Sequence, residues 1–80
     1  MSEEILKKLQ DMIIDYTGND KLIIKEETSL VNDLELSSLD IISLVGIIED
    51  NFDILVDDQD IVSLLTVKDV IDYIIRKKEA

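Results

Sequence analysis

Apolar residues recur at helical spacing in four stretches of the chain, and polar, turn-forming residues separate these stretches. The first stretch follows Ser2, a residue suited to capping a helix, and ends at Gly18, which favours a helix C-terminus. Its apolar positions form one stripe, which predicts a helix with one face packed against a core. The stripe consists of Ile5, Leu6, Leu9, Met12, Ile13 and Tyr16.

The second stretch separates into two faces on a helical wheel and predicts a helix over about residues 38–51. Ser37 occupies the N-cap position, and Asp40 follows as the acid of a capping box. The predicted core face carries Ile41, Leu44, Val45, Ile48 and Phe52. The predicted outer face carries Leu39, Asp40, Ser43, Gly46, Ile47 and Asp50. Exposed aliphatic side chains bordered by carboxylates are typical of transient docking surfaces, where apolar atoms supply affinity and charges steer the partner.

Two further stretches predict a short third helix and a longer last helix. The aspartates of residues 57–60 can begin the third helix, which would carry Ile61, Leu64 and Leu65. Thr66 and Asp69 form a second capping box at the start of the last helix. The apolar side of that helix consists of Val67, Val70, Ile71, Ile74 and Ile75, and its last turn carries Arg76, Lys77 and Lys78, whose charges complement the helix dipole.

A long connection, residues 19–36, joins the first two predicted helices. Its apolar patch, Leu22 to Ile24, has no second strand pattern to pair with, so we expect an extended or single-turn segment that plugs the bundle. The expected fold class is all-α: a small four-helix bundle of three longer helices and one short helix, with a long loop after the first helix. We expect residues 1–80 to form a single domain.

The absence of two residue types narrows the possible chemistry. The chain has no cysteine and no histidine, which excludes disulfides, thiolate or histidine-based zinc sites and Ser-His-Asp catalysis. The acidic cluster of residues 49–60 lacks the spacing and central glycine of an EF-hand, so we expect no specific metal site. No residue is a candidate for catalysis, and the sequence predicts a protein that is not an enzyme.

Negative charge dominates the chain and is unevenly distributed. The net charge is −11, and residues 26–67 contain eleven acidic residues and no lysine or arginine. Such a surface argues against nucleic-acid and anionic-membrane binding and favours partners with basic docking surfaces. Acidic residues follow Met1 where a signal peptide needs basic ones, and no apolar run reaches membrane-spanning length. We therefore expect a soluble, cytoplasmic monomer.

Ser38 is the candidate residue for covalent modification. It is the first residue of the second predicted helix, beside backbone N–H groups without helical partners and at the positive end of the helix dipole. A phosphate group bound to its hydroxyl would be stabilised there. A serine at a helix start is more often only a cap, so this position alone does not assign a function.

The residues around Ser38 resemble the acyl carrier protein family. The resemblance lies in Asp33-Leu34, Ser38-Leu39-Asp40, Leu44-Val45, Glu49-Asp50 and Phe52-Asp53, and it extends over nearly the whole chain. In that family the serine of an Asp-Ser-Leu motif at the start of the second helix carries 4′-phosphopantetheine, and Ser38 stands at the matching position. Ser37 replaces the aspartate of this motif, and Glu35 replaces the glycine that usually follows Asp-Leu.

The resemblance implies a discrete acyl carrier protein that holds acyl intermediates as thioesters on a 4′-phosphopantetheine arm. A phosphopantetheinyl transferase would attach the arm to Ser38 from coenzyme A, and acyl-handling enzymes of fatty-acid biosynthesis would receive the acyl groups. By the same resemblance, the partner-binding residues are Leu39, Asp40, Ile42, Ser43, Gly46, Glu49 and Asp50. The implied acyl cleft, between the second and third helices, consists of Ile48, Val56, Ile61 and Leu64.

Two alternatives remain open from the sequence. The family often has an acid at the position of Ser43 and a larger apolar residue at that of Gly46, so this chain is also compatible with a carrier dedicated to a polyketide, lipid-tailoring or aminoacyl pathway. The second alternative is an unmodified acidic helical adaptor in which Ser38 is only structural. The missing aspartate before Ser38 supports this adaptor hypothesis.

Overall fold

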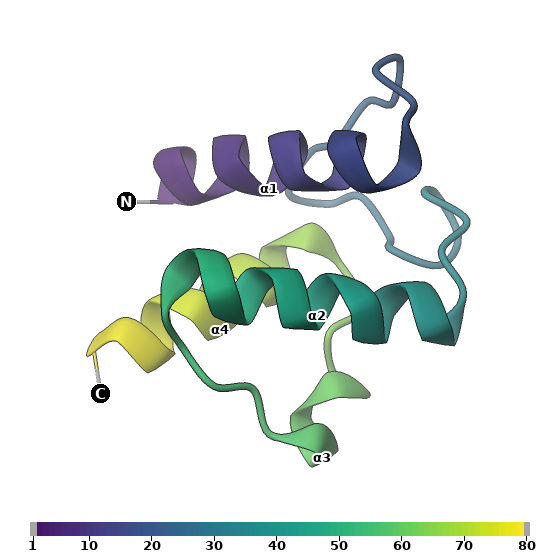
Figure 1. The fold of residues 1–80 in the computed structure, drawn as a ribbon. Helices are drawn as coiled ribbons and strands as arrows, with labels where there is room; N and C mark the ends of the chain where they lie inside the picture. Colours follow the sequence, from purple (N-terminus) through teal and green to yellow (C-terminus); the bar gives the residue numbers. More distant parts are fainter. Residues whose placement is uncertain (1, 80) are drawn as a thin grey trace.

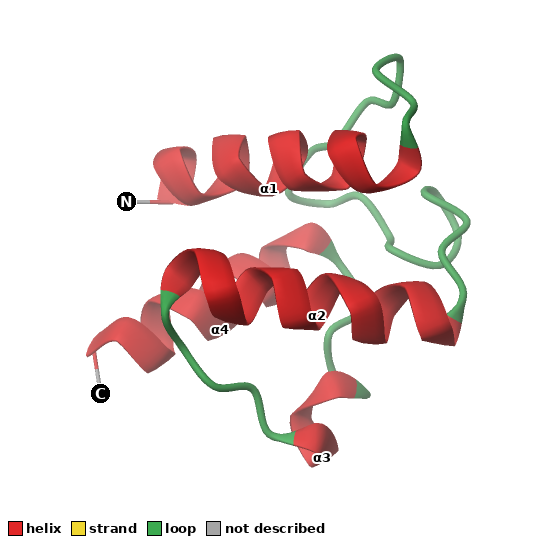
Figure 2. Cartoon of the chain, in the orientation of Figure 1, coloured by secondary structure: helices red, strands yellow, loops and turns green. Residues whose placement is uncertain are grey.

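The computed structural model describes residues 2–79 and contains four helices within that range. They are α1 (Ser2–Thr17), α2 (Ser38–Phe52), α3 (Asp58–Ile61) and α4 (Val67–Glu79). Figure 1 shows α2 in front of α4, with α1 above both, and Figure 2 shows that the longest connection joins α1 to α2. The prediction of an all-α fold with three longer helices, one short helix and a long first loop is confirmed.

The core lies where α1, α2 and α4 meet, and α4 supplies its most buried side chains. Val67 and Ile71 are each 1% exposed, and Ile74 is 0% exposed. The predicted apolar stripes face this core. The buried positions of the first two helices are Ile5, Leu9 and Ile13 of α1, and Leu44, Val45, Ile48 and Phe52 of α2.

The predictions for two apolar stretches are wrong in part: Tyr16, predicted in the core stripe of the first helix, is exposed, and Leu64 and Leu65, predicted on the third helix, lie after its end. Tyr16 is 38% exposed because it lies in the last turn of α1, where its hydroxyl donates a hydrogen bond to a carboxylate of α2 rather than its ring packing inside. Leu65 is 61% exposed because α3 ends at Ile61 and only Leu64 of the following linker turns inward. Ile47, predicted on the outer face of α2, is half-buried and packs against the core.

The connection between α1 and α2 is a structured segment fastened to the start of α4. The backbone N–H groups of Val67 and Lys68 donate to carbonyl oxygens of Thr28 and Glu26 at 3.0 and 2.8 Å, which pairs N–H groups that α4 cannot satisfy itself. The predicted apolar plug is confirmed in part: within residues 22–24, Ile24 is buried and its neighbour Leu22 half-buried, but Ile23 is 74% exposed.

Side-chain caps define where the last helix begins. The Asp69 carboxylate accepts a hydrogen bond from the Thr66 N–H at 3.0 Å, and the Asp69 N–H donates to the Thr66 hydroxyl oxygen at 3.2 Å. This reciprocal pair is the predicted second capping box, and it fixes the chain direction into α4.

Gly46 can be replaced by alanine with a gain in stability. Beyond the adjacent residues and the backbone of its own helix, a Cβ built at Gly46 would have no atom within 4 Å, so the packing of the chain does not require a glycine there. Because glycine in a helix interior costs up to about 1 kcal/mol relative to alanine, Gly46→Ala is expected to raise the unfolding free energy by up to that amount in urea titrations. Gly18→Ala is the matched control and is expected to destabilise, because Gly18 has φ +71°. A lower unfolding free energy for Gly46→Ala would contradict this prediction.

Candidate functional site at the start of α2

The first turn of α2 is fixed by a complete capping box. Ser37 has extended backbone angles of φ −82° and ψ 172°, and its hydroxyl oxygen accepts a hydrogen bond from the Asp40 N–H at 3.2 Å. The Asp40 Oδ2 in turn accepts hydrogen bonds from the Ser37 N–H and the Ser37 hydroxyl, each at 2.9 Å. The predicted N-cap and its acid are confirmed, and they hold the helix start in one geometry.

The two adjacent serines have different surroundings. The cap uses the hydroxyl of Ser37 and not that of Ser38. Ser38 is exposed and is the first helical residue of α2. Ser38 therefore offers an accessible oxygen at the positive end of a 15-residue helix. This setting fits a covalently attached phosphodiester, whose negative charge the N–H groups of the first turn would stabilise.

Tyr16 belongs to this site although the sequence analysis placed it in the core. Its hydroxyl donates a hydrogen bond to Asp40 Oδ1 at 2.8 Å across 24 residues of sequence. The pKa of the Asp40 carboxyl lies below its ordinary value because of hydrogen bonds from the Ser37 backbone first, then from the Tyr16 hydroxyl and the Ser37 hydroxyl. No helical or strand periodicity links residues so far apart, so sequence reasoning had no signal for this contact.

Most of the predicted partner-binding residues lie exposed along α2. Leu39 and Ile42 are 76% and 54% exposed, so both present apolar surface to the solvent one turn apart on the helix. Ser43, Gly46 and Asp50 are exposed on the same helix. Asp40 and Glu49 are half-buried, and both accept hydrogen bonds from the backbone: Asp40 from the N–H of Ser37, and Glu49 from the loop after α2.

Glu49 has a structural contact that the sequence analysis did not foresee. Its Oε2 accepts a hydrogen bond from the Val56 N–H at 2.9 Å, which ties the loop after α2 back onto the helix. Val56 is one of the residues implied for the acyl cleft, so this bond also holds that part of the loop in place.

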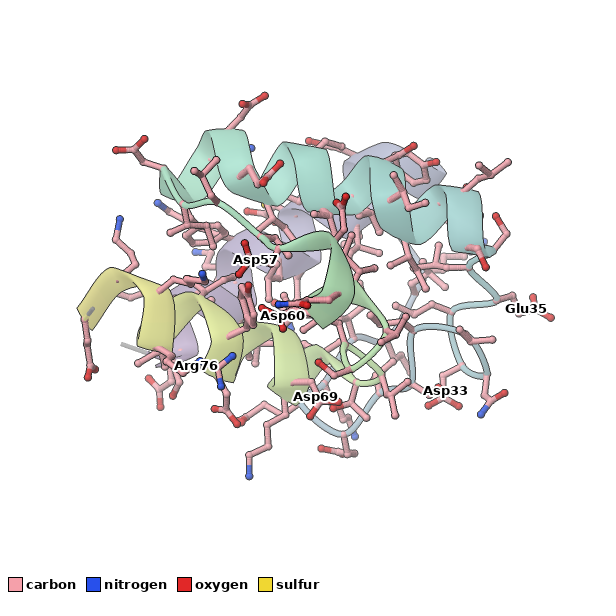
Figure 3. All side chains as sticks on the ribbon, turned by 90° about the horizontal axis from the view of Figure 1, so that it is seen from below. Asp33, Glu35, Asp57, Asp60, Asp69 and Arg76 are labelled. Atoms are coloured by element: carbon pink, nitrogen blue, oxygen red, sulfur yellow. The ribbon has the colours of Figure 1, made fainter. Side chains whose placement is uncertain are left out.

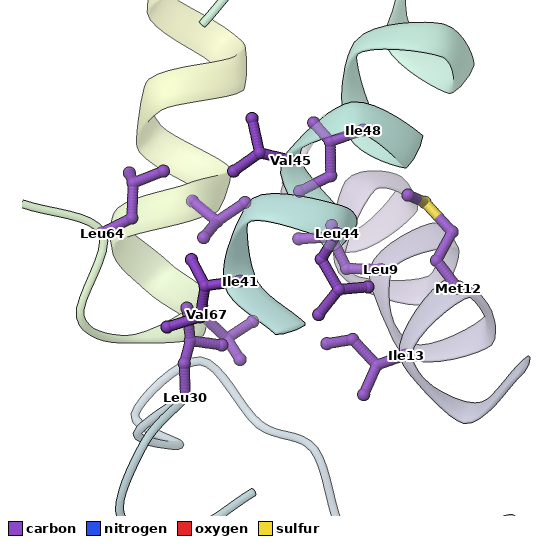
Figure 4. Close-up of a pocket in the computed structure, with 11 residues that line it drawn as sticks. Leu9, Met12, Ile13, Leu30, Ile41, Leu44, Val45, Ile48, Leu64 and Val67 are labelled. Atoms are coloured by element: carbon purple, nitrogen blue, oxygen red, sulfur yellow. The ribbon is translucent and has the colours of Figure 1, made fainter. Parts of the chain in front are cut away.

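A small apolar cavity opens between α1, α2 and the start of α4. Figure 4 shows side chains from these elements converging on it. Of the residues implied for the acyl cleft, Ile48 and Leu64 line this cavity, whereas Val56 and Ile61 are half-buried against the core and do not line it. The remaining lining residues are Leu9, Met12, Ile13, Leu30, Ile41, Leu44, Val45, Val67 and Val70. With a volume of about 20 Å³, the cavity has room for about one water molecule, so an acyl chain would enter only if the surrounding side chains moved apart.

Negative charge surrounds the site and is little compensated. Within residues 2–79 the structure contains one ion pair, between Lys77 Nζ and Asp57 Oδ2 at 3.6 Å, and its side chains are 31% and 60% exposed. Figure 3 shows Asp57 and Asp60 beside α4, and Asp33 and Glu35 on the loop that precedes α2. No helix of residues 2–79 has the length and apolar content needed to cross a bilayer.

Added salt is expected to stabilise the fold. Raising the ionic strength from about 0.01 M to about 0.15 M shortens the Debye length from about 30 Å to about 8 Å, which weakens the repulsion among the carboxylates of residues 26–67. The Tm measured by circular dichroism should rise, and millimolar magnesium should raise it further. An unchanged Tm under both conditions would contradict this prediction.

Comparisons with known proteins agree with this geometry. The family model described as a phosphopantetheine attachment site matches residues 7–74, a span that contains Ser38. Among curated proteins, the acyl carrier protein of Syntrophobacter fumaroxidans is 42% identical over 73 residues, which cover 91% of this chain and 90% of that protein. The acyl carrier protein of Thermotoga maritima is 39% identical over 75 residues, which cover 94% and 93% of the two chains.

The fold agrees as well. A crystal structure of an acyl carrier protein from Thermotoga maritima superposes with a TM-score of 0.87 at 31% identity, covering 98% of this chain and 91% of that one. The family assignment also argues against the adaptor hypothesis, since family membership implies a prosthetic group. The chain therefore belongs to the acyl carrier proteins, non-catalytic carriers that receive 4′-phosphopantetheine from a phosphopantetheinyl transferase and work with acyl-handling enzymes.

Proposed function

We propose that Ser38 carries the 4′-phosphopantetheine group and that the protein delivers acyl groups to enzymes of cytoplasmic fatty-acid biosynthesis. The observation that carries this proposal is the division between the two serines. Ser37 completes the cap, so the exposed Ser38 hydroxyl can react without opening the first turn of α2.

Attachment at Ser38 requires little rearrangement of the protein. The Ser38 Oγ forms the bond to phosphorus and loses its proton, while coenzyme A releases adenosine 3′,5′-bisphosphate. The free N–H groups at the start of α2 then face the negative phosphodiester. The attached group supplies a thiol, which this chain lacks because it has no cysteine.

We assign the docking of partner enzymes to α2. Leu39 and Ile42 present apolar surface near the attachment residue, and Asp50 extends the acidic character along the helix. This combination suits a transient complex with a basic partner, because charges accelerate the encounter and a small apolar contact lets it dissociate. Ser43 and Gly46 add little side-chain volume to the middle of this face, and the carboxylates of Asp40 and Glu49 lie at its border.

We assign the acyl cleft to the space bordered by Ile48, Val56, Ile61 and Leu64. The cavity lined by Ile48 and Leu64 borders this space, and an acyl chain would extend from it toward Val56 and Ile61 if α3 moved away from α2. The helix α3 is the element suited to such movement, because it has only four residues and none of them is buried.

The pathway is tested by loading the modified protein. Incubation of the holo form with malonyl-coenzyme A, its transacylase and the elongating enzymes of fatty-acid synthesis should give the stepwise mass gains of a growing acyl chain. A holo protein that stays unloaded there but accepts a group from an enzyme of another carrier pathway would instead support a dedicated carrier. Glu35, Ser37, Ser43 and Gly46 are the residues that would then explain the different specificity.

A further inference from the structure

The hydroxyl of Tyr16 joins the end of α1 to the start of α2. Figure 1 shows the last turn of α1 and the first turn of α2 at the same end of the molecule. The Tyr16 hydroxyl donates to Asp40 Oδ1 at 2.8 Å, and the other carboxylate oxygen accepts the N–H and hydroxyl of Ser37. Both oxygens of Asp40 are therefore held, one from within the cap and one from a different helix.

The hydroxyl is the functional part of Tyr16. The side chain is 38% exposed and is not one of the buried core residues, so its hydroxyl can be removed without changing the core. A phenylalanine would retain this ring and lose only the bond to Asp40. A hydrogen bond to a carboxylate also restricts its rotation, and Asp40 can cap Ser37 only in one orientation.

We propose that Tyr16 is a positioning residue for the modification of Ser38. Its hydroxyl holds Asp40, Asp40 holds Ser37, and the first turn of α2 then presents Ser38 to the transferase in a single conformation. The inference rests on the proposed attachment at Ser38. It adds a residue of α1 to a site that the sequence confines to α2 and the loop before it.

Removing the hydroxyl should weaken recognition by the transferase rather than the chemical step. If only a fraction of the Tyr16→Phe molecules has the ordered first turn, the apparent affinity is the intrinsic affinity multiplied by that fraction. We expect the KM of a phosphopantetheinyl transferase for apo Tyr16→Phe to rise about fivefold, the size expected for the loss of one ordinary solvent-exposed hydrogen bond, with kcat little changed.

Tyr73→Phe is the matched control. Tyr73 also donates its hydroxyl to an aspartate, Asp60, at 2.8 Å, but this bond fastens α3 to α4 and not the start of α2. Tyr73 is buried and its hydroxyl also accepts a hydrogen bond from the Asp57 N–H at 3.3 Å, so general destabilisation would affect Tyr73→Phe at least as strongly as Tyr16→Phe. We expect the KM of Tyr73→Phe to stay within about twofold of the unmutated protein.

The titration of Asp40 gives a readout independent of modification. The Tyr16 hydroxyl is one of the groups that lower the pKa of the Asp40 carboxyl, so NMR titration of Tyr16→Phe should show this pKa moved up toward its ordinary value. Because the folded pKa is lowered, the stability supplied by these bonds is present above the ordinary pKa and is lost as pH falls through the folded value. In Tyr16→Phe that loss should occur at higher pH.

A second variant, Asp40→Asn, tests the same contact from its other side, so the inference can be tested even if Tyr16→Phe folds poorly. Asp40→Asn keeps a polar side chain at the cap but removes the charge that Tyr16 holds, so it should also raise the KM. Adding Tyr16→Phe to Asp40→Asn should then have a smaller effect than Tyr16→Phe has alone, because the two side chains share one contact. An unchanged KM in Tyr16→Phe with a raised Asp40 pKa would overturn the inference. The proposed function would survive that result, and only failure of the unmutated protein to accept the group at Ser38 would overturn both.

Discussion

Ser38→Ala is expected to abolish attachment of phosphopantetheine and, with it, every acyl-carrying function. The substitution removes the only oxygen proposed to bond to phosphorus. The side chain is exposed and takes no part in the cap, so the unfolding free energy should fall by less than about 0.5 kcal/mol. Intact mass spectrometry after incubation with coenzyme A and a transferase measures the first effect, and a urea titration measures the second.

Ser37→Ala is the matched control, because it removes the same atom one residue earlier. Loss of the N-cap should cost about 1 kcal/mol of unfolding free energy, yet the protein should still accept the group at Ser38. The two variants therefore have different profiles: Ser38→Ala loses modification and keeps stability, whereas Ser37→Ala loses stability and still accepts the group at Ser38, with a raised KM because the cap that presents Ser38 is lost. A Ser38→Ala protein that gains the group on Ser37 would show that the serines have been assigned the wrong roles.

Ile74→Ala is expected to have the largest effect on stability. Ile74 is 0% exposed and lies on α4 where it packs against the rest of the core. Truncation of a buried isoleucine to alanine typically costs about 2 to 5 kcal/mol, because it loses apolar contacts and leaves a cavity. A domain of 80 residues has a total stability of about 4 to 12 kcal/mol. A large part of the stability of the fold should therefore be lost, with a corresponding shift of the urea midpoint.

Leu65→Ala provides the comparison for that variant. Leu65 belongs to an apolar run in the sequence but is 61% exposed, so its truncation should change the unfolding free energy by less than about 0.5 kcal/mol. Equal destabilisation by Ile74→Ala and Leu65→Ala would contradict the placement of the core.

The three longer helices, and the starts of α2 and α4, were predictable because their causes are local, whereas Ser2, predicted to cap the first helix, is its first helical residue. Apolar spacing defines α1, α2 and α4, and the capping boxes at Ser37 and Thr66 need only a side chain and an acid three residues later. The setting of Ser38 follows from the same rule, since an N-cap at Ser37 makes Ser38 the first helical residue. The family resemblance added the chemistry, which no local rule supplies.

The sequence-based predictions were wrong where contacts between distant residues decide whether a side chain is buried or where a helix ends. Tyr16 continues the apolar stripe of α1, but the approach of α2 gives its hydroxyl a carboxylate partner and draws it to the surface. Leu65 follows a helix that ends sooner than its apolar pattern suggests, because residues 62 and 63 form a turn, after which the Leu65 carbonyl oxygen accepts a hydrogen bond from the Leu30 N–H of the first loop at 3.0 Å. The lining of the cavity by α1 also depends on how the helices pack, which spacing within one helix cannot reveal.

The most direct test is the mass of the unmutated protein after incubation with coenzyme A, magnesium and a broad-specificity phosphopantetheinyl transferase, followed by peptide mapping. We predict a gain of one phosphopantetheine group per chain, located on the peptide that contains Ser38 and absent from Ser38→Ala. No gain with several transferases, or a gain located on another residue, would contradict the assignment of Ser38 as the attachment site.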